Sequence, residues 1–379
     1  MEYKLGDLVQ MDSGYAFKSN LFNDECNGMP IIRIRDVNSG KSNTYFSGEY
    51  DEKYIVNNNE MLISMDGSFV IKKWNGGKAL LNQRVCRIKS RNSILLDDYI
   101  YRILPFKLKK IEDATPFVTV KHLSIKTVEE IQISIPNIEE QKKIIKLLDI
   151  SQELIDKRKA QIEALDELVK SKFIEMFGDP VKNTMNWDMV TLSEVGSIGR
   201  GVSKHRPRNA PELLGGDYPL IQTGDVANAE LYIKDYKATY SELGLKQSKL
   251  WRKGTLCITI AANIAKTGIL TFDACFPDSV VGFIAEEKTN NIFMYYWFSS
   301  FQKLLEEQAP ESAQKNINLK ILSDLKVIIP PIELQNQFSD FVNQVDKLKF
   351  EMQKSLEEME NNFNSLMQKA FKGELFNEL

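Results

Sequence analysis

The 379-residue chain has few of the residues that build disulfide frameworks and metal centres. Its four cysteines are far apart and form no CxxC pair, and its only histidines are His122 and His205. Zinc sites need clustered cysteine and histidine ligands. We therefore predict no metal site, and we predict buried free thiols in a reducing compartment.

Long hydrophobic runs are also missing. No window approaches the roughly 18 uncharged apolar residues of a membrane-spanning helix. The first residues, Met1 to Lys4, lack the apolar core of a signal peptide. We therefore predict a cytoplasmic protein that has no membrane partner.

Motifs of the common catalytic centres are absent as well. The segment 329–332 lacks the amide and the aromatic ring of the Asn-Pro-Pro-Tyr motif of adenine methylation, and Lys72 stands where a P-loop would need its first glycine. The best imitation of a nuclease metal site is Asp278 followed by residues 286–288, which is more typical of a turn and a solvated strand end. We predict a non-catalytic chain with no cofactor of its own.

What the chain does contain is a long internal repeat. The motif Ile-Pro-Asn-Ile-Glu-Glu-Gln at 135–141 returns 194 positions later as Ile-Pro-Pro-Ile-Glu-Leu-Gln at 329–335. The register then holds for about ten helical turns. Polar positions differ between the copies while apolar positions stay apolar, as a repeated packing surface requires. The matched apolar positions are Ile144, Leu148, Leu154, Ile162, Leu165, Val169, Phe173 and Phe177 in the first copy, and Phe338, Val342, Leu348, Leu356, Met359, Phe363, Met367 and Phe371 in the second.

Each repeat predicts a helix of about 38 residues, or about 57 Å. A compact module of about 130 residues is only about 30–40 Å across. Helices this long extend beyond such a module, so we predict that the two copies pack as an antiparallel coiled coil. Two independent amphipathic helices, each on its own domain, are the alternative.

The segments that precede the helices read as short strands separated by glycine-containing turns. The predicted strands are 30–35, 60–64 and 81–88 in the first segment, and 218–223, 255–261, 268–272 and 280–285 in the second, with a helix at 291–308. Faint echoes between the segments, such as Pro-Ile-Ile at 30–32 and Pro-Leu-Ile at 219–221, indicate similar folds. The predicted fold is α+β: two curled, β-rich domains (1–128 and 181–322), each followed by a long helix (129–180 and 323–379), with internal pseudo-twofold symmetry.

The net charge of −3 hides an uneven distribution. Residues 1–128 carry +4 and residues 181–322 carry +1, whereas 129–180 and 323–379 carry −4 each. A DNA duplex would be attracted to the two segments that precede the helices and repelled by the helices. Offsets of this size also arise by ordinary scatter, so alone they decide nothing.

Several motifs resemble those of target recognition domains. They lie at 79–85, 204–208, 221–226 and 276–281, and the segments 122–125 and 314–318 precede the repeated helices as they do in that family. With the duplicated order of segment and helix, they make the whole chain resemble the DNA specificity subunit (S subunit, HsdS-like) of type I restriction–modification systems.

The resemblance implies that each variable segment is a target recognition domain for one half of a bipartite, asymmetric target in double-stranded DNA. The paired helices would set the gap between the halves and dock two methyltransferase (modification) subunits. Two ATP-dependent restriction subunits would complete the nuclease. The resemblance places S-adenosylmethionine, ATP and magnesium in those partners, and it implies no catalysis in this chain.

Candidate DNA contacts in the second segment follow from charge and loop position, strengthened by the resemblance. The loop after Arg200 can follow phosphates, and we expect positioning rather than base reading from its cations. These are Lys204, His205, Arg206 and Arg208. Gln222 and Thr223 end a predicted strand. Glutamine can grip the edge of adenine, although hydrogen bonds that stabilise the turn are an equal alternative.

In the first segment, Arg33 and Arg35 are predicted to share one face of a strand, where they read bases or pair with Asp36 or Asp51. Lys72 and Lys73 are comparable candidates. Further candidates come from position in the repeat: Tyr15 and Lys18 follow Gly14 as Lys204 follows Gly201, and Lys315 and Asn316 precede the second helix. Lys315 and Asn316 are expected to contact the DNA backbone or to be structural, and Asn82, Gln83 and Arg84 are expected to be structural.

The starts of the repeated helices are the predicted docking sites, since duplication offers two like surfaces to two copies of one partner. The predicted residues are Ile138, Gln141, Ile145, Ile332, Gln335 and Phe338. Two other functions stay open at this point. One is a coiled-coil interaction protein whose domains bind protein or sugar, which would not show the steep salt dependence of DNA binding. The other is a self-sufficient nuclease, which would cleave DNA in the presence of metal.

Overall fold

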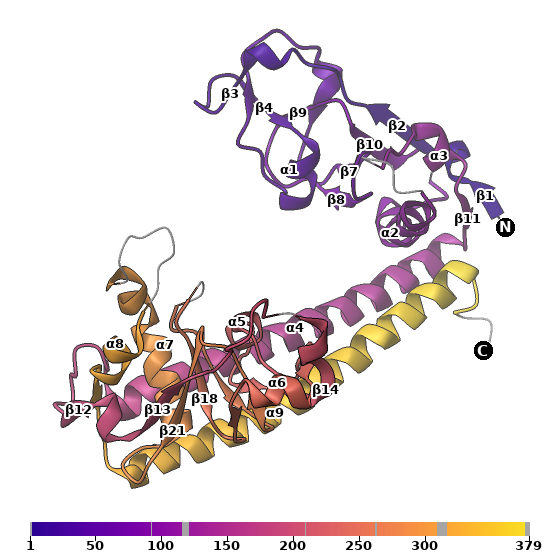
Figure 1. Ribbon diagram of the computed structural model, residues 1–379. Helices are drawn as coiled ribbons and strands as arrows, with labels where there is room; N and C mark the ends of the chain where they lie inside the picture. The colour runs from indigo at the N-terminus through magenta and orange to yellow at the C-terminus, as the bar shows by residue number, and fades with distance from the viewer. Residues whose placement is uncertain are drawn as a thin grey trace. The chain divides into compact units, whose positions relative to one another are not determined.

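The chain folds into two compact units (Figure 1). The computed structural model describes residues 2–91, 93–115, 121–208, 210–261, 264–308 and 317–375. Unit 1 holds residues 1–159 and 354–379, and unit 2 holds residues 160–353. Both divisions fall inside long helices, α4 (Ile138–Phe177) and α9 (Ile332–Lys372), so each unit contains part of both helices.

Unit 1 contains a β-rich part, residues 2–134, which we call domain 1. One antiparallel sheet has the order β2-β10-β7-β8, and a second has the order β3-β5-β4-β9-β6, in which β4 and β9 are parallel. Strand β1 pairs with β11. The strands are β1 (Glu2–Lys4), β2 (Val9–Ser13), β3 (Phe22–Asn23), β4 (Met29–Ile32), β5 (Tyr45–Phe46), β6 (Ile55–Val56), β7 (Met61–Ser64), β8 (Ile71–Lys73), β9 (Ala79–Leu81), β10 (Val85–Ser90) and β11 (Gln132–Ser134). The helices are η1 (Leu5–Asp7), η2 (Ser19–Leu21), α1 (Ile34–Ser39), η3 (Glu52–Tyr54), α2 (Asp97–Ala114) and α3 (Ile125–Glu129).

Unit 2 contains the corresponding domain 2, residues 189–328. Its sheets have the orders β13-β21-β18-β19-β15 and β16-β14-β20-β17, and β12 pairs with β22. The strands are β12 (Met189–Thr191), β13 (Gly196–Arg200), β14 (Leu214–Leu220), β15 (Tyr232–Ile233), β16 (Ala238–Tyr240), β17 (Leu250–Trp251), β18 (Leu256–Thr259), β19 (Thr267–Leu270), β20 (Ala274–Cys275), β21 (Val280–Ala285) and β22 (Lys326–Ile328). The helices are η4 (Leu192–Glu194), η5 (Pro211–Leu213), α5 (Thr223–Ala227), α6 (Glu242–Lys246), α7 (Asn291–Gln308) and α8 (Leu319–Ser323).

The two domains repeat one order of elements and strand pairings. The run β2-β10-β7-β8 in domain 1 corresponds to β13-β21-β18-β19 in domain 2, and the parallel pair β4–β9 corresponds to β14–β20. Helices α2 and α7 begin 194 residues apart, as do α3 and α8. The predicted mixed α+β fold with two similar β-rich domains is confirmed.

The predicted strands 30–35 and 218–223 run into short helices, and the predicted strand 81–88 spans the turn between β9 and β10. Strand β4 ends at Ile32 and β14 ends at Leu220, and a short helix begins directly afterwards in each domain. In domain 1 the carboxylate of Asp36 accepts a hydrogen bond from the backbone N–H of Arg33 (2.8 Å), which closes the first turn of α1. Arg33 and Arg35 therefore do not share a strand face, and the prediction that they do is wrong.

The long helices pack against each other in opposite directions within each unit. In unit 1, Ile144 and Leu148 near the start of α4 lie in one core with Ala370 and Phe371 near the end of α9. In unit 2 the ends are reversed: the last turns of α4 share a core with the first turns of α9. The predicted antiparallel pairing holds in each unit. No helix of the described ranges is long and apolar enough to span a membrane.

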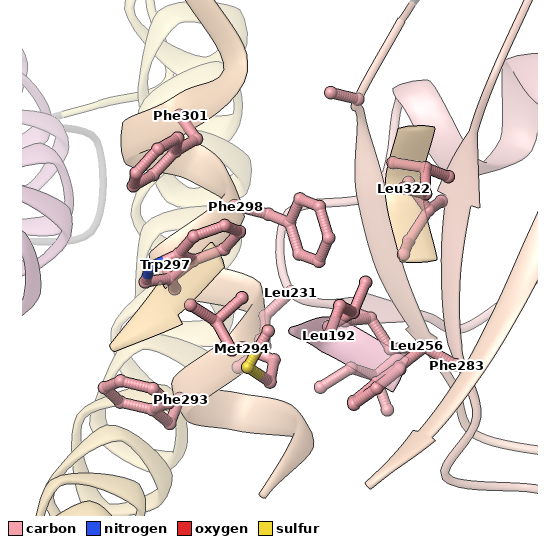
Figure 2. Close-up of a cluster of buried hydrophobic side chains, with 14 of the residues drawn as sticks. Leu192, Leu231, Leu256, Phe283, Phe293, Met294, Trp297, Phe298, Phe301 and Leu322 are labelled. Atoms are coloured by element: carbon pink, nitrogen blue, oxygen red, sulfur yellow. The ribbon is translucent and has the colours of Figure 1, made fainter. Parts of the chain in front are cut away.

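In unit 2 the helix pair is part of the domain core (Figure 2). Met294 and Phe298 of α7 point toward the side of the strands. On the side of the long helices, the ring of Phe293 lies 5.6 Å from that of Phe173 and 4.9 Å from that of Phe177. Full burial of a phenylalanine contributes about 1.5–3 kcal/mol. These aromatic contacts therefore fix domain 2 firmly to its part of the helix pair.

A lysine ties the same three elements together by charge. Lys349 of α9, whose side chain is 14% exposed, lies 2.9 Å from Asp166 of α4 and 2.8 Å from Glu230 of domain 2. Burial alone would lower the pKa of Lys349, but the hydrogen bonds that it donates to Glu230 and Asp166 outweigh burial and raise that pKa. The lysine thus stays charged and joins both helices to domain 2.

Each repeated helix begins with a buried glutamine. The side-chain amide of Gln141 donates to the carbonyls of Ile94 (2.7 Å) and Pro136 (2.9 Å), and its oxygen accepts from the N–H of Leu96 (2.9 Å). The side chain is completely buried. It therefore fixes the start of α4 to the segment that leads into α2.

Gln335 makes the corresponding contacts in unit 2. Its amide donates to the carbonyls of Lys288 (3.0 Å) and Pro330 (2.8 Å), and its oxygen accepts from the hydroxyl of Thr289 (2.9 Å) and the N–H of Asn290 (3.3 Å). The glutamine of the duplicated motif is thus a bridge between the helix start and the loop before α7. This explains why the motif is repeated.

The burial of these residues corrects the docking prediction. Three of the predicted contacts have no exposed surface and are occupied inside the chain: Gln141, Gln335 and Phe338. The other three, Ile138, Ile145 and Ile332, are partly exposed. The sequence pattern did not distinguish the buried residues from the partly exposed ones, because both kinds lie in the first turns of the repeated helices.

Replacing Gln335 with leucine should destabilise the protein. The change leaves buried carbonyls and a buried hydroxyl without partners, so the free energy of unfolding should fall by about 1–3 kcal/mol. Chemical denaturation would measure it. Gln337→Leu on the exposed face of α9 is the matched control and should change stability by less than about 0.5 kcal/mol. Equal effects of the two variants would contradict the bridging role.

Candidate nucleic-acid interface

The basic loop of domain 2, residues 200–208, is held in place by contacts with other segments of the domain. A Cβ atom on Gly201 would lie 2.3 Å from the carbonyl oxygen of Pro277, so only glycine fits there. The side-chain oxygen of Gln247 accepts hydrogen bonds from the N–H groups of Lys204 (2.7 Å) and His205 (3.1 Å). The loop is therefore ordered before any ligand arrives.

The structure brings three predicted arginines together around one carboxylate. Arg200 donates to the backbone carbonyl of Asp278. Arg208 lies 2.6 Å and Arg206 3.9 Å from the carboxylate oxygens of Asp278. With the exposed Lys204 on the same loop, the positive charge exceeds the negative charge. Such a loop can follow phosphates.

Arg206 is also occupied within its own loop. Its guanidinium donates to the carbonyls of Ser203 (2.7 Å) and His205 (2.8 Å). The ring of His205 lies near the carbonyl of Pro207, at 3.3 Å. Of the loop residues, Lys204 is therefore the better candidate for a direct phosphate contact, and Arg206 supports the loop.

The matching loop of domain 1 is built on the same close approach but carries less charge. A Cβ atom on Gly14 would lie 1.9 Å from the carbonyl oxygen of Asn82. Tyr15 is half exposed, and its ring packs on those of Phe17 (5.1 Å) and Tyr54 (5.2 Å). Lys18, at the end of this loop, is exposed.

Arg33 and Gln222 occupy the same position in the two domains. Each directly precedes the short helix that follows the strand, and its backbone N–H donates at 2.8 Å to an aspartate three residues later, Asp36 or Asp225. Both side chains are exposed. The turn is thus stabilised through the backbone of Gln222, which leaves its side-chain amide available for a ligand. Thr223 is the half-buried first residue of α5.

The remaining cations of domain 1 have neighbours inside the chain. Arg35 lies 3.6 Å from Asp36 and 3.4 Å from the hydroxyl of Thr44. Asp51 is paired with Lys53. Lys73 contacts the carboxylate of Asp98, which ties β8 to α2, whereas Lys72 is exposed. Asp36 links Arg35 to Arg33, because the same carboxylate accepts the hydrogen bond from the backbone N–H of Arg33.

Lys315 and Asn316 lie outside the described residues. Their counterparts in the repeat are Lys121 and His122 of domain 1. His122 contacts the carboxylate of Asp66, and Nη1 of Arg84 lies 3.0 Å from its Nε2 atom. The half-exposed Arg84 and His122 line a hollow of about 310 Å³. Arg84 was expected to be structural. The repeat could have pointed to this cluster, because His122 lies 194 residues before the predicted contact Asn316.

The described ranges contain no cluster of three or more potential metal ligands among histidine, cysteine, aspartate and glutamate. Burial raises the pKa of the Cys86 thiol to about 12, and it also raises the pKa values of Cys257 and Cys275. These three are buried free thiols as predicted, whereas Cys26 is exposed.

The long helices expose apolar side chains away from their starts. Leu154 of α4 and Leu348 of α9 are equivalent in the repeat and are 51% and 47% exposed. Their apolar character had placed them in the repeated packing surface. They form a duplicated, exposed apolar pair.

Comparison with known proteins agrees with this arrangement. A family model described as type I restriction modification DNA specificity domain matches residues 1–164 and 185–361. The chain is 29% identical to the type I restriction enzyme EcoBI specificity subunit of Escherichia coli, over 99% of this chain and 86% of that protein. It is 24% identical to the type I restriction enzyme MjaVIII specificity subunit of Methanocaldococcus jannaschii, over 98% of this chain and 92% of that protein.

Solved structures share the fold at low sequence identity. The S subunit of a type I restriction–modification system from M. genitalium has a TM-score of 0.54 at 15% identity, over 98% of this chain and 96% of that chain. A chain described in connection with complex assembly and conformational transition of the type I R-M system has a TM-score of 0.67 at 16% identity, over 99% and 98%. From the family model, which matches most of its length, the chain belongs to the type I restriction–modification DNA specificity family.

Proposed function

We propose that domains 1 and 2 each read one part of a bipartite, asymmetric DNA target, without catalysis by this chain. The observation that carries the proposal is one structural position with two different side chains. Arg33 in domain 1 and Gln222 in domain 2 stand on the same backbone turn, exposed and held by the same aspartate bond. A shared scaffold with different readers suits two half-sites of different sequence.

The chemistry of these two side chains predicts which bases they prefer. Arginine binds the O6 and N7 atoms of guanine with two parallel hydrogen bonds, and glutamine binds the N6 and N7 atoms of adenine in the same way. The basic loop 200–208 and the loop after Gly14 would bind phosphates and set the register of each domain on the duplex. Base contacts and phosphate contacts are thus assigned to separate elements.

The long helices are proposed to set the gap between the half-sites and to carry partner subunits. The duplicated, half-exposed Leu154 and Leu348 offer two like apolar contacts, which suits two copies of one methyltransferase subunit. Ile138, Ile145 and Ile332 remain secondary candidates at the helix starts. Two restriction subunits would join through the methyltransferase subunits, and S-adenosylmethionine, ATP and magnesium would belong to these partners.

Lys204→Ala should weaken binding to target and unrelated duplexes by a similar factor. Loss of one phosphate contact should also reduce the slope of log affinity against log salt by about 0.9. Fluorescence anisotropy at several salt concentrations measures both quantities. Lys182→Ala, which removes the same charge from the exposed segment between α4 and β12, is the control and should leave the slope unchanged. A loss confined to the target duplex would contradict the positioning role.

Gln222→Ala should relax the base preference at one position of one half-site, and Arg33→Ala should do so in the other half-site. Gln222→Arg should change the preferred base from adenine to guanine. Binding-site selection from a randomised duplex pool reads out all three variants. Unchanged preferences in the three selections would refute the assignment of these residues as base readers.

Adding seven residues to both long helices should widen the target gap by about three base pairs, since seven residues add about 10 Å of helix and each pair adds about 3.4 Å. The insertions belong after Lys159 and after Gln353, where the two units divide. Methylated sites in cells that express the variant with its methyltransferase subunit report the gap. An insertion in one helix alone is the control and should abolish assembly. An unchanged gap in the double variant would overturn the spacing role.

A further inference from the structure

An acidic side chain lies at the centre of the arginine cluster of domain 2. Asp278 is in the turn between β20 and β21, and it is one-third exposed. Its carboxylate oxygens lie 2.6 Å from Arg208 and 3.9 Å from Arg206, and its backbone carbonyl accepts from Arg200. One carboxylate thus lies beside Arg208 and Arg206, two cations of the loop that is proposed to bind phosphates.

This carboxylate contributes little to holding the fold. Arg206 and Arg208 are each about half exposed, so water screens the guanidinium side of both ion pairs, although Oδ1 of Asp278, which faces Arg208, is itself buried. The loop is held instead through its backbone. Two of its N–H groups donate to the side-chain oxygen of Gln247, and Gly201 packs on Pro277. Asp278 therefore serves mainly to neutralise charge at the DNA-facing loop.

The equivalent turn of domain 1 contains no acidic residue, although Asp66 from another connection lies 3.5 Å from its Arg84. Its equivalent turn, between β9 and β10, carries Gln83 and Arg84 where domain 2 carries Asp278 and Ser279. Both turns lie under the same glycine-anchored loop, at Gly14 and Gly201. Asp278 therefore corresponds to the neutral Gln83, and the basic Arg84 corresponds to the neutral Ser279.

We propose that Asp278 is an electrostatic brake on DNA binding by domain 2. The inference rests on the proposed DNA-reading function. A phosphate that binds Arg206 or Arg208 must displace Asp278 from the arginine, and the carboxylate repels that phosphate as well. Every duplex meets this penalty whatever its sequence. Domain 2 therefore depends on base contacts to stay bound, and its retention on unrelated DNA is reduced.

The test is Asp278→Asn in the full chain, measured on a duplex that contains the selected target and on an unrelated duplex. Release of an arginine to form one more phosphate contact should raise affinity for both duplexes by roughly 5–10-fold near 0.1 M salt, and it should steepen the salt slope by about 0.9. Asp273→Asn is the matched control, since Asp273 is similarly exposed and pairs with Arg252 outside the loop. Asp273→Asn should change the affinity and the salt slope less than Asp278→Asn does.

Other roles of Asp278 give different results. If Asp278 accepts a hydrogen bond from N4 of cytosine, Asp278→Asn lowers affinity for the target alone, which overturns the brake. If it holds the loop in shape, the variant lowers the melting temperature and weakens binding to both duplexes, which also overturns it.

A second variant isolates the arginines. In an Arg206→Gln, Arg208→Gln background, adding Asp278→Asn should no longer raise affinity by more than about twofold, because no arginine is left to release; a full increase would overturn the brake. Failure of the wild-type chain to bind any duplex with salt dependence would instead refute the proposed function itself.

Discussion

The structure depends on the burial of the long helices in the two domain cores, each of which holds the start of one helix and the end of the other. In unit 2 the ring of Phe293 of α7 packs against those of Phe173 and Phe177, and Phe338 packs against Phe177, so the helix pair and domain 2 share one core. Unit 1 has the same arrangement around Ile144 and Leu148. A domain fixed in this way cannot turn independently of its part of the helices. Any function that needs a defined orientation of the reading surface starts from this constraint.

On this shared scaffold the two domains differ at the surface and not in the core. The same backbone turn presents arginine in one domain and glutamine in the other, and the same strand connection carries Arg84 in one and Asp278 in the other. Core positions are constrained by close packing, whereas exposed positions on fixed turns change with little effect on stability. Recognition can therefore diverge between the domains while the fold is kept.

The duplicated helix start shows what a motif can and cannot reveal. Its repetition correctly indicated two equivalent helices, but its glutamines were assigned to partner docking, whereas Gln141 and Gln335 are buried bridges. A polar residue in a repeated motif serves equally well as a surface contact or as a satisfied buried group. Only the carbonyls and N–H groups placed around it decide between them. Leu154 and Leu348 show the converse: their apolar spacing assigned them to the packing surface, but in the tertiary structure they are exposed.

The sequence by itself determined the repeat, the two long helices and the α+β character of the domains. Each of these follows from a regular spacing of apolar residues along the sequence. It could not determine the arginine cluster around Asp278 or the hydrogen-bonded turns that hold Arg33 and Gln222. The cluster depends on loops of different length, which bring residues 70 or more positions apart within hydrogen-bonding distance. Periodicity records which face of an element is buried, and tertiary structure decides which side chains share a surface.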